Sequence, residues 1–212
     1  MAETAPIDAP ALAAACESLQ HALATAASGL HPTWLPLLLG KWPFLETGAV
    51  DGLHGRLLAR SLAREGLPDP SVLAAPDGRL ACSGPSGIRR GLCVLALARR
   101  PGVLRCCVEK DSRVALKEAV GDAAPPLAAL SWQGRVVRRH VASWTPLHWA
   151  CAGFVDWCEL PAGGDRLLRQ LVGMSLPCGL LNMGRRLRLA PPDFSGPDAL
   201  AALADAGGVW PC

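Results

Sequence analysis

The segment from Leu147 to Cys158 constrains the fold more than any other part of the sequence. Thr145 and Pro146 suit the N-cap and the first position of a helix. The residues that follow are apolar almost all round that helix: Leu147, Ala150, Phe154 and Trp157 on one side, and His148, Cys151, Val155 and Cys158 on another. A helix that is apolar on all sides is normally buried by its neighbours, so we predict a helical domain built around this segment.

Helical spacing and capping signals recur along the rest of the chain, whereas the alternation typical of sheet strands does not. We predict helices over residues 11–27, 51–65, 111–120, 127–142, 147–158, 164–176 and 198–206, and short helical turns over 30–47. Residues 70–87 are rich in Pro, Gly and Ser, which predicts a loop with a short strand near residues 79–82. Residues 103–108 suit a strand or a helix.

These segments predict a mainly α fold: one compact helical domain around a buried central helix, with at most a minor short-stranded element. Within that domain we expect an N-terminal helix (residues 1–30), a core helical region (31–178) and a C-terminal tail with a short helix (179–212).

Composition excludes several classes of protein. Half of the 212 residues are apolar and 18% are charged, which argues against disorder and predicts that some apolar surface lies against a partner. A net charge of +3 is too small to indicate nucleic-acid binding. The nine cysteines are odd in number and irregularly spaced, which is typical of free thiols in a reducing cytosol. No signal peptide, lipid-anchor motif or membrane-spanning run is recognisable.

Motifs that would indicate catalysis are incomplete. The glycines around Gly179 and Gly184 lack the Lys and Ser or Thr of a phosphate-binding loop, and Gly84–Gly87 lacks the spacing of a nucleophile elbow. His148, Cys151 and Cys158 share a helix face and could offer metal ligands, but buried Cys and His in an apolar helix are more often core residues. We therefore predict no catalytic residue, no cofactor and no metal, and hence no enzyme.

Arginine placement is the more informative signal. Lysine occurs only at Lys41, Lys110 and Lys117, so nearly all positive charge is arginine. Two clusters at helical spacing are candidate partner-binding residues: Arg56, Arg60 and Arg64, and Arg135, Arg138 and Arg139. Like charges at this spacing destabilise a helix by roughly 0.2–0.5 kcal/mol per pair. Either acidic residues elsewhere in the fold pair with them, or they contact an acidic protein partner.

Three stretches together resemble the SctK family of bacterial type III secretion systems, in the branch found in plant-associated and related proteobacteria. They are the His31–Pro36 stretch with the following Trp42–Leu45, the Gly66–Pro70 turn, and Trp144–Ala150. The resemblance spans about residues 32–177 and implies a cytosolic, cofactor-free accessory protein at the inner membrane. Such proteins bridge the cytoplasmic domain of the inner-membrane ring to the pod protein, which recruits the stator and ATPase.

Two other classes remain open. A regulatory nucleic-acid-binding protein would need a basic recognition helix, for which Arg135 to His140 is the candidate. A thiol- or metal-dependent enzyme would need a reactive cysteine or a bound metal ion. We expect neither nucleic acid nor direct membrane insertion.

Overall fold

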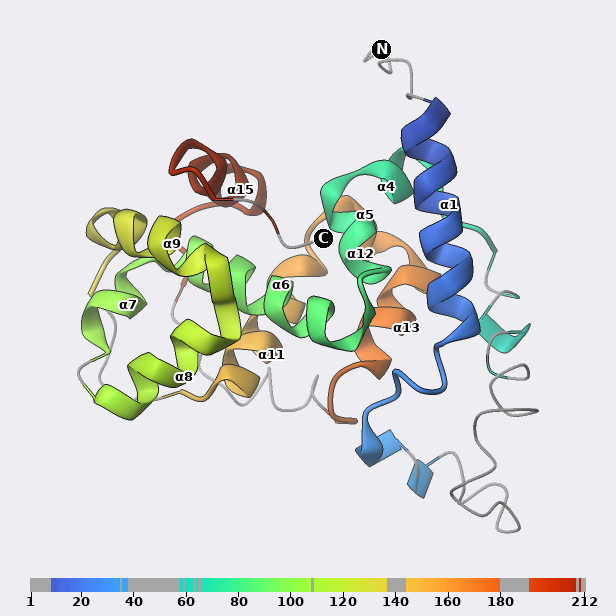
Figure 1. The fold of residues 1–212 in the computed structure, drawn as a ribbon, viewed down its shortest axis with the longest axis horizontal. Coiled ribbons are helices and arrows are strands. Elements are labelled where there is room, and N and C mark those ends of the chain that lie inside the picture. Colours follow the sequence, from blue (N-terminus) through green and yellow to red (C-terminus); the bar gives the residue numbers. More distant parts are fainter. Residues whose placement is uncertain are drawn as a thin grey trace.

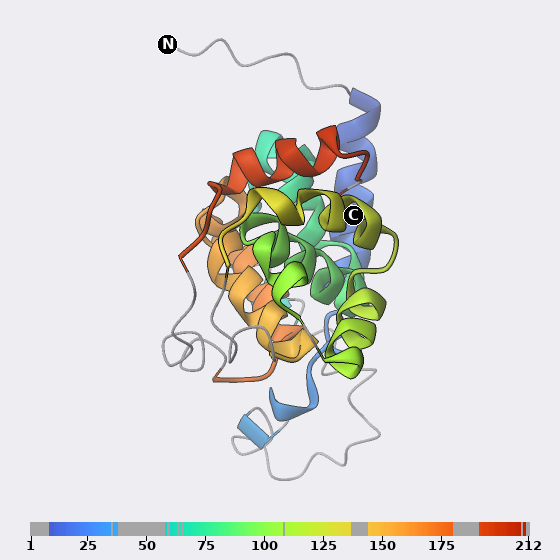
Figure 2. The ribbon, with the colours of Figure 1, turned by 90° about the vertical axis from the view of Figure 1, so that its left-hand side faces the viewer.

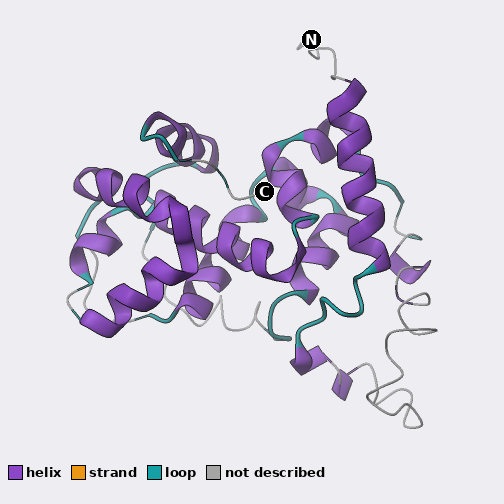
Figure 3. Cartoon of the chain, viewed as in Figure 1, coloured by secondary structure: helices purple, strands orange, loops and turns teal. Residues whose placement is uncertain are grey.

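The fold is helical throughout the part of the chain that the structure describes (Figure 1). The computed structural model describes residues 9–34, 36–37, 58, 60–62, 64, 66–107, 109–136, 144–179, 191–208 and 210. None of these residues belongs to a strand (Figure 3). The predicted mainly α fold class is therefore confirmed, without a stranded element in these ranges.

The helices follow one another at short intervals. The α-helices are α1 (Ala9–Ala24), α4 (Pro70–Ala74), α5 (Pro76–Ala81), α6 (Gly84–Arg99), α7 (Gly102–Cys106), α8 (Lys110–Val120), α9 (Ala124–Leu130), α11 (Pro146–Trp157), α12 (Pro161–Gly164), α13 (Arg166–Met174) and α15 (Gly196–Asp205). The 3-10 turns are η1 (Pro32–Trp34), η3 (Gly121–Ala123) and η4 (Ser131–Gln133). Helices α6 and α11 lie in the middle, α1 at one end, and α7, α8 and α9 at the other (Figure 1).

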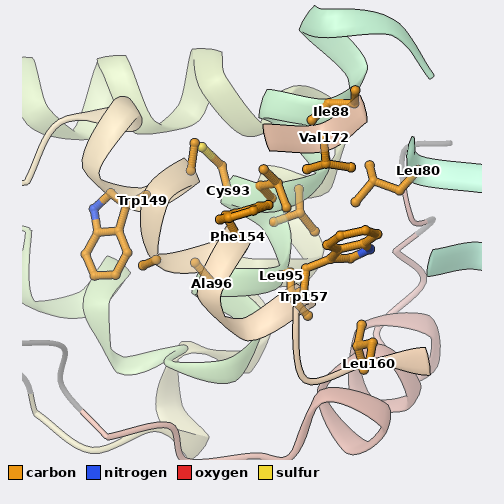
Figure 4. Close-up of a cluster of buried hydrophobic side chains, with 14 of the residues drawn as sticks. Leu80, Ile88, Cys93, Leu95, Ala96, Trp149, Phe154, Trp157, Leu160 and Val172 are labelled. Atoms are coloured by element: carbon orange, nitrogen blue, oxygen red, sulfur yellow. The ribbon is translucent and has the colours of Figure 1, made fainter. Parts of the chain in front are cut away.

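Helix α11 is central, as predicted, and it shares the centre of the molecule with α6. It begins at Pro146, and the backbone N–H of Thr145 donates to His148 Nδ1 at 3.2 Å, which closes a capping box. Trp149 and Trp157 are fully buried, and Phe154 lies between them (Figure 4). The buried apolar residues form one cluster to which both α1 and α15 contribute.

Gly153 allows α11 to approach the backbone of α6. A Cβ atom at this position would lie 1.9 Å from the carbonyl oxygen of Leu92 and 2.9 Å from its Cα. No side chain fits that space, and the obstacle is backbone that cannot rotate away. Helices α6 and α11 accordingly form the most extensive helix pair among the described elements.

A buried ionic cluster ties the C-terminal ends of α6 and α11 together. Arg100 donates to Asp156 Oδ2 at 2.5 Å and to Oδ1 at 3.0 Å, and Arg99 donates to Oδ1 at 2.9 Å. The side chains of Arg99, Arg100 and Asp156 are only 6%, 3% and 3% exposed. Arg99 also pairs with Glu159 at 2.7 Å, whose side chain is 62% exposed. Asp156 therefore bridges two buried guanidinium groups, and Glu159 supplies the second negative charge of the cluster.

Arg99 also holds the segment that leads into α15. Its carbonyl oxygen accepts a hydrogen bond from the backbone N–H of Asp193 at 2.7 Å, and its Nε donates to the carbonyl of Phe194 at 3.1 Å. Helix α15 then packs over α6 and α9, and Figure 2 shows it alongside α9. Its buried Ala199 and Leu203 complete that side of the core.

The prediction of a loop with a strand at residues 70–87 is wrong. The segment forms α4, α5 and the first turn of α6. Asp69 caps α4 by accepting the Ser71 N–H at 2.8 Å, and Pro70 and Pro76 occupy the first helical positions. Proline at a helix start lacks only an N–H that would be unpaired there anyway. The prolines therefore begin helices here rather than interrupt one.

The helix predicted over residues 127–142 is also wrong in its extent. Helix α9 ends at Leu130, η4 follows, and Gly134 has extended backbone. A Cβ atom at Gly134 would lie 2.2 Å from the backbone nitrogen of Gly102, so the chain turns here against the start of α7. Residues 137–143 lie outside the described residues.

Other predicted elements agree in position. Residues 102–106 form a helix, α7, which decides between strand and helix for that segment. Helices α1, α8, α13 and α15 occur where expected, with ends shifted by up to three residues. Most of the predicted 51–65 helix and of the 30–47 turns lies outside the described residues, although residues 58 and 60–62 are helical and η1 is a short helical turn.

Candidate partner-binding site

An open groove lies at the end of the molecule formed by α7, α8 and α9. Its volume is about 600 Å³, which is within the range of small-molecule sites. Its lining residues are Leu104, Cys107, Lys110, Arg113, Val114, Lys117, Val120, Ala124, Pro125 and Ala128. Each of the three helices contributes, so the groove exists only in the folded chain.

The floor of the groove is apolar. Cys107 and Val120 are buried, and Leu104 and Ala124 are partly exposed. Val114 projects from α8 with 46% of its surface exposed. Ala128 on α9 is small, which leaves the space between the helices open. An apolar floor that stays in contact with water is a common feature of binding surfaces.

One edge of the groove is basic. Lys110, Arg113 and Lys117 are exposed and project from the same side of α8, at intervals of three and four residues. No carboxylate of the described residues forms an ion pair with any of them, and Glu109, four residues before Arg113, does not reach it. The acidic residues Asp111 and Glu118 are turned roughly 100° away around the helix.

Local sequence explains why α8 presents this edge. Leu116 and Val120 are buried toward the core. The carboxylate of Asp111, in the first turn, interacts favourably with the positive end of the helix dipole. Gly121 ends the helix with a φ of 56°, a conformation that glycine adopts without strain. The inward pair Leu116 and Val120 therefore sets the rotation of α8 and turns its three cations outward.

The structure does not combine the predicted arginine clusters into one site. Arg60 and Arg64 are exposed, in a segment near the α1 end of the molecule (Figure 1). Arg135 follows η4, which packs on α7 at the other end. Arg56, Arg138 and Arg139 lie outside the described residues.

Arg135 is paired within the fold. Its Nε donates to Asp193 Oδ1 at 2.5 Å, its Nη2 donates to the carbonyl of Pro192 at 3.2 Å, and its backbone N–H donates to Asp193 Oδ2 at 3.2 Å. For Arg135 the structure therefore shows the pairing with an internal acid, and its side chain is still largely exposed. Arg135 and Val136 are not helical, and the rest of the basic recognition helix considered for residues 135–140 lies outside the described residues.

Sequence reasoning missed the basic edge of α8, although a signal was present. Two of the three lysines in the chain, Lys110 and Lys117, lie in this helix with Arg113 between them. The two predicted clusters consist of arginine alone, whereas this stripe mixes lysine and arginine at the same periodicity.

The histidine and thiols of α11 serve packing and capping in this structure. His148 Nδ1 lies 2.7 Å from the Thr145 hydroxyl and accepts the Thr145 N–H, so that nitrogen is occupied. Burial raises the pKa of the Cys151 thiol to about 12 and also raises the pKa of Cys158. No group of three or more His, Cys, Asp or Glu residues able to hold a metal ion occurs within the described part of the chain.

Thiol reactivity should follow these differences in burial. The pKa of Cys93 is also raised to about 12, chiefly by burial, so roughly one in 10,000 of these thiols is ionised at about pH 8. Among the described thiols, we expect iodoacetamide to label the exposed Cys16 first and to label Cys93 and Cys151 only in denaturant, as read by peptide mass spectrometry. Rapid labelling of Cys93 or Cys151 in the folded protein would contradict this account.

Comparison with known proteins identifies no relative: no family model, no curated protein and no solved structure matches the chain. Among the described helices, none is both long and apolar enough to cross a membrane.

Proposed function

We propose that this protein is a non-enzymatic adaptor that binds another protein through the groove between α7, α8 and α9. The proposal rests on one observation: an apolar floor in contact with solvent, edged by three cations that no described carboxylate neutralises. Exposed apolar surface often marks a site that a partner covers, and cations beside it favour a partner of opposite charge. Arg60 and Arg64 remain a second candidate contact surface, because they too are exposed.

The proposed setting is the sorting platform of a bacterial type III secretion system. This part of the proposal is supported by the resemblance of residues 32–177 to the SctK family, and the helical fold agrees with it. The proposed partners are the cytoplasmic domain of the inner-membrane ring, the pod protein, and the stator and ATPase complex. The protein would then act at the cytosolic face of the inner membrane through these partners, without a cofactor, without nucleic acid and without inserting into the bilayer.

Affinity capture tests this proposal. The full chain, tagged and expressed in its own host under secretion-inducing conditions, is expected to retain ring, pod or stator components, identified by mass spectrometry against an untagged control. Recovery of none of these components would refute the secretion setting. Recovery of bound nucleic acid at physiological salt, or of a stoichiometric metal ion, would instead favour the regulatory or enzymatic alternatives.

A further inference from the structure

We propose that the groove binds an amphipathic helix whose apolar stripe is flanked by a row of acidic residues. This inference rests on the proposed adaptor function and specifies the chemistry of the partner at the same site. Helix-in-groove recognition reads apolar anchors at intervals of three and four residues, and the groove between α8 and α9 offers both the apolar floor and the charge for it.

The positions of the cations favour a row of carboxylates over a single anionic group. Lys110, Arg113 and Lys117 lie in line along α8, and at 1.5 Å per residue they span roughly 10 Å of its axis. A single phosphate or carboxylate would be bound by cations that converge on one point. Three cations spread over two helical turns instead match acidic residues that recur every three or four positions on a facing helix.

The like charges on α8 also gain from such a partner. Lys110 and Arg113 are three residues apart, and Arg113 and Lys117 are four apart, spacings at which equal charges repel along a helix. A row of carboxylates across the groove would replace this repulsion by attraction. The groove thus discriminates by charge as well as by shape, and a basic amphipathic helix would be rejected.

The apolar floor lies below the charged edge, so the groove suits a protein segment as its partner better than a membrane surface. Cys107 and Val120 are buried beneath the groove, and the exposed cations stand along its edge. A flat bilayer would meet the charged edge without reaching the apolar floor. A helix bearing leucine-sized side chains can insert them between α8 and α9 and contact Leu104 and Val114.

The probe for this test is a fluorescein-labelled synthetic helix of about 18 residues with a leucine stripe flanked by glutamates, long enough for several turns. A matched peptide carries lysine at every glutamate position. Anisotropy titration of the full chain is expected to show that the glutamate peptide binds at least about tenfold more tightly, because exposed ion pairs contribute up to about fivefold each. Equal binding of the two peptides would overturn the proposal.

Charge reversal locates the site. The variant Lys110→Glu, Arg113→Glu, Lys117→Glu is expected to reverse the preference between the two peptides. The control variant Arg79→Glu, Arg89→Glu, Arg166→Glu changes the net charge by the same amount at exposed positions outside the groove, and it should keep the original preference. Loss of preference in the control and retention in the groove variant would overturn the assignment of the site.

A second variant covers the case in which charge reversal unfolds α8. Lys110→Gln, Arg113→Gln, Lys117→Gln removes the repulsion along the helix, and it should fold and bind both peptides with similar affinity. A preference that survives this neutralisation in a folded chain would overturn the proposal. The proposal would also be overturned if sedimentation showed that the wild-type chain is a dimer and that the glutamine variant is a monomer. It would likewise be overturned if anionic phosphatidylglycerol vesicles bound the chain through these three residues and neither peptide bound it.

The two levels of the proposal fail separately. If the wild-type chain captures secretion components and the glutamine variant captures them equally well, the groove inference is wrong and the adaptor function stands. If the peptide preference and its reversal are observed but no secretion component is captured, the groove inference stands and the proposed setting is wrong.

Discussion

Replacing Asp156 by alanine is expected to lower the free energy of unfolding by about 3–5 kcal/mol, the cost of breaking a buried ion pair by removing one partner. Asp156 accepts hydrogen bonds from both Arg99 and Arg100, and the three side chains are almost completely buried. Without this carboxylate, Arg100 loses both bonds to it, and Arg99 keeps Glu159 as its carboxylate partner. Urea unfolding followed by circular dichroism measures the loss.

Glu159→Ala is the matched control. Glu159 pairs with the same Arg99 at 2.7 Å, but its side chain is 62% exposed, so solvent screens the interaction and the expected cost is about 1 kcal/mol or less. The contrast between two carboxylates on one guanidinium isolates the effect of burial. Equal effects of the two substitutions would show that burial of Asp156 does not decide its contribution.

The second large effect is expected for Gly153→Ala, which should destabilise the fold by roughly 3 kcal/mol, the upper end for overpacking a well-packed interior. The new methyl group would lie 1.9 Å from the Leu92 carbonyl oxygen and 2.5 Å from its carbonyl carbon. Relief requires α6 and α11 to separate, which would loosen the packing of Trp149 and Trp157 as well. Thermal unfolding and near-ultraviolet circular dichroism of the tryptophans report both changes.

Gly173→Ala is the control for this substitution. Gly173 is also a helical glycine, but a Cβ atom there would meet only Phe154 Cζ at 3.8 Å, an ordinary contact. Since alanine favours a helix over glycine by roughly 0.5–1 kcal/mol, this variant should be as stable as the wild type or more so. A destabilised Gly173→Ala with an unaffected Gly153→Ala would refute the close approach of α6 and α11.

Several elements could be predicted because their signals are local. The Thr145 and Pro146 start of α11, its all-round apolar surface, and the end of α8 at Gly121 depend on residues within a few positions of one another. Such capping and periodicity rules act through backbone geometry within one or two turns. The mainly α fold class and the central position of α11 follow from these signals.

The wrong predictions arose where one local signal has two meanings. Proline can end a helix or begin one. Pro70 begins a helix because Asp69 caps it, and Pro76 begins a helix because Ala75 before it has extended backbone. Helical periodicity after Leu130 favoured a longer helix, but the close contact of Gly134 with Gly102 diverts the chain. That contact joins residues 32 positions apart, beyond the reach of any local rule.

The sequence by itself determined the helices whose caps and periodicity are local, such as α8 and α11, because these signals depend on residues a few positions apart. Only the tertiary structure decided which charges are neutralised: Arg135 pairs with Asp193, 58 positions away, and Arg100 pairs with Asp156, 56 positions away. The packing of the helices also places Lys110, Arg113 and Lys117 along an open apolar groove. Charge pairing depends on distance in space, and the packing of helices sets that distance.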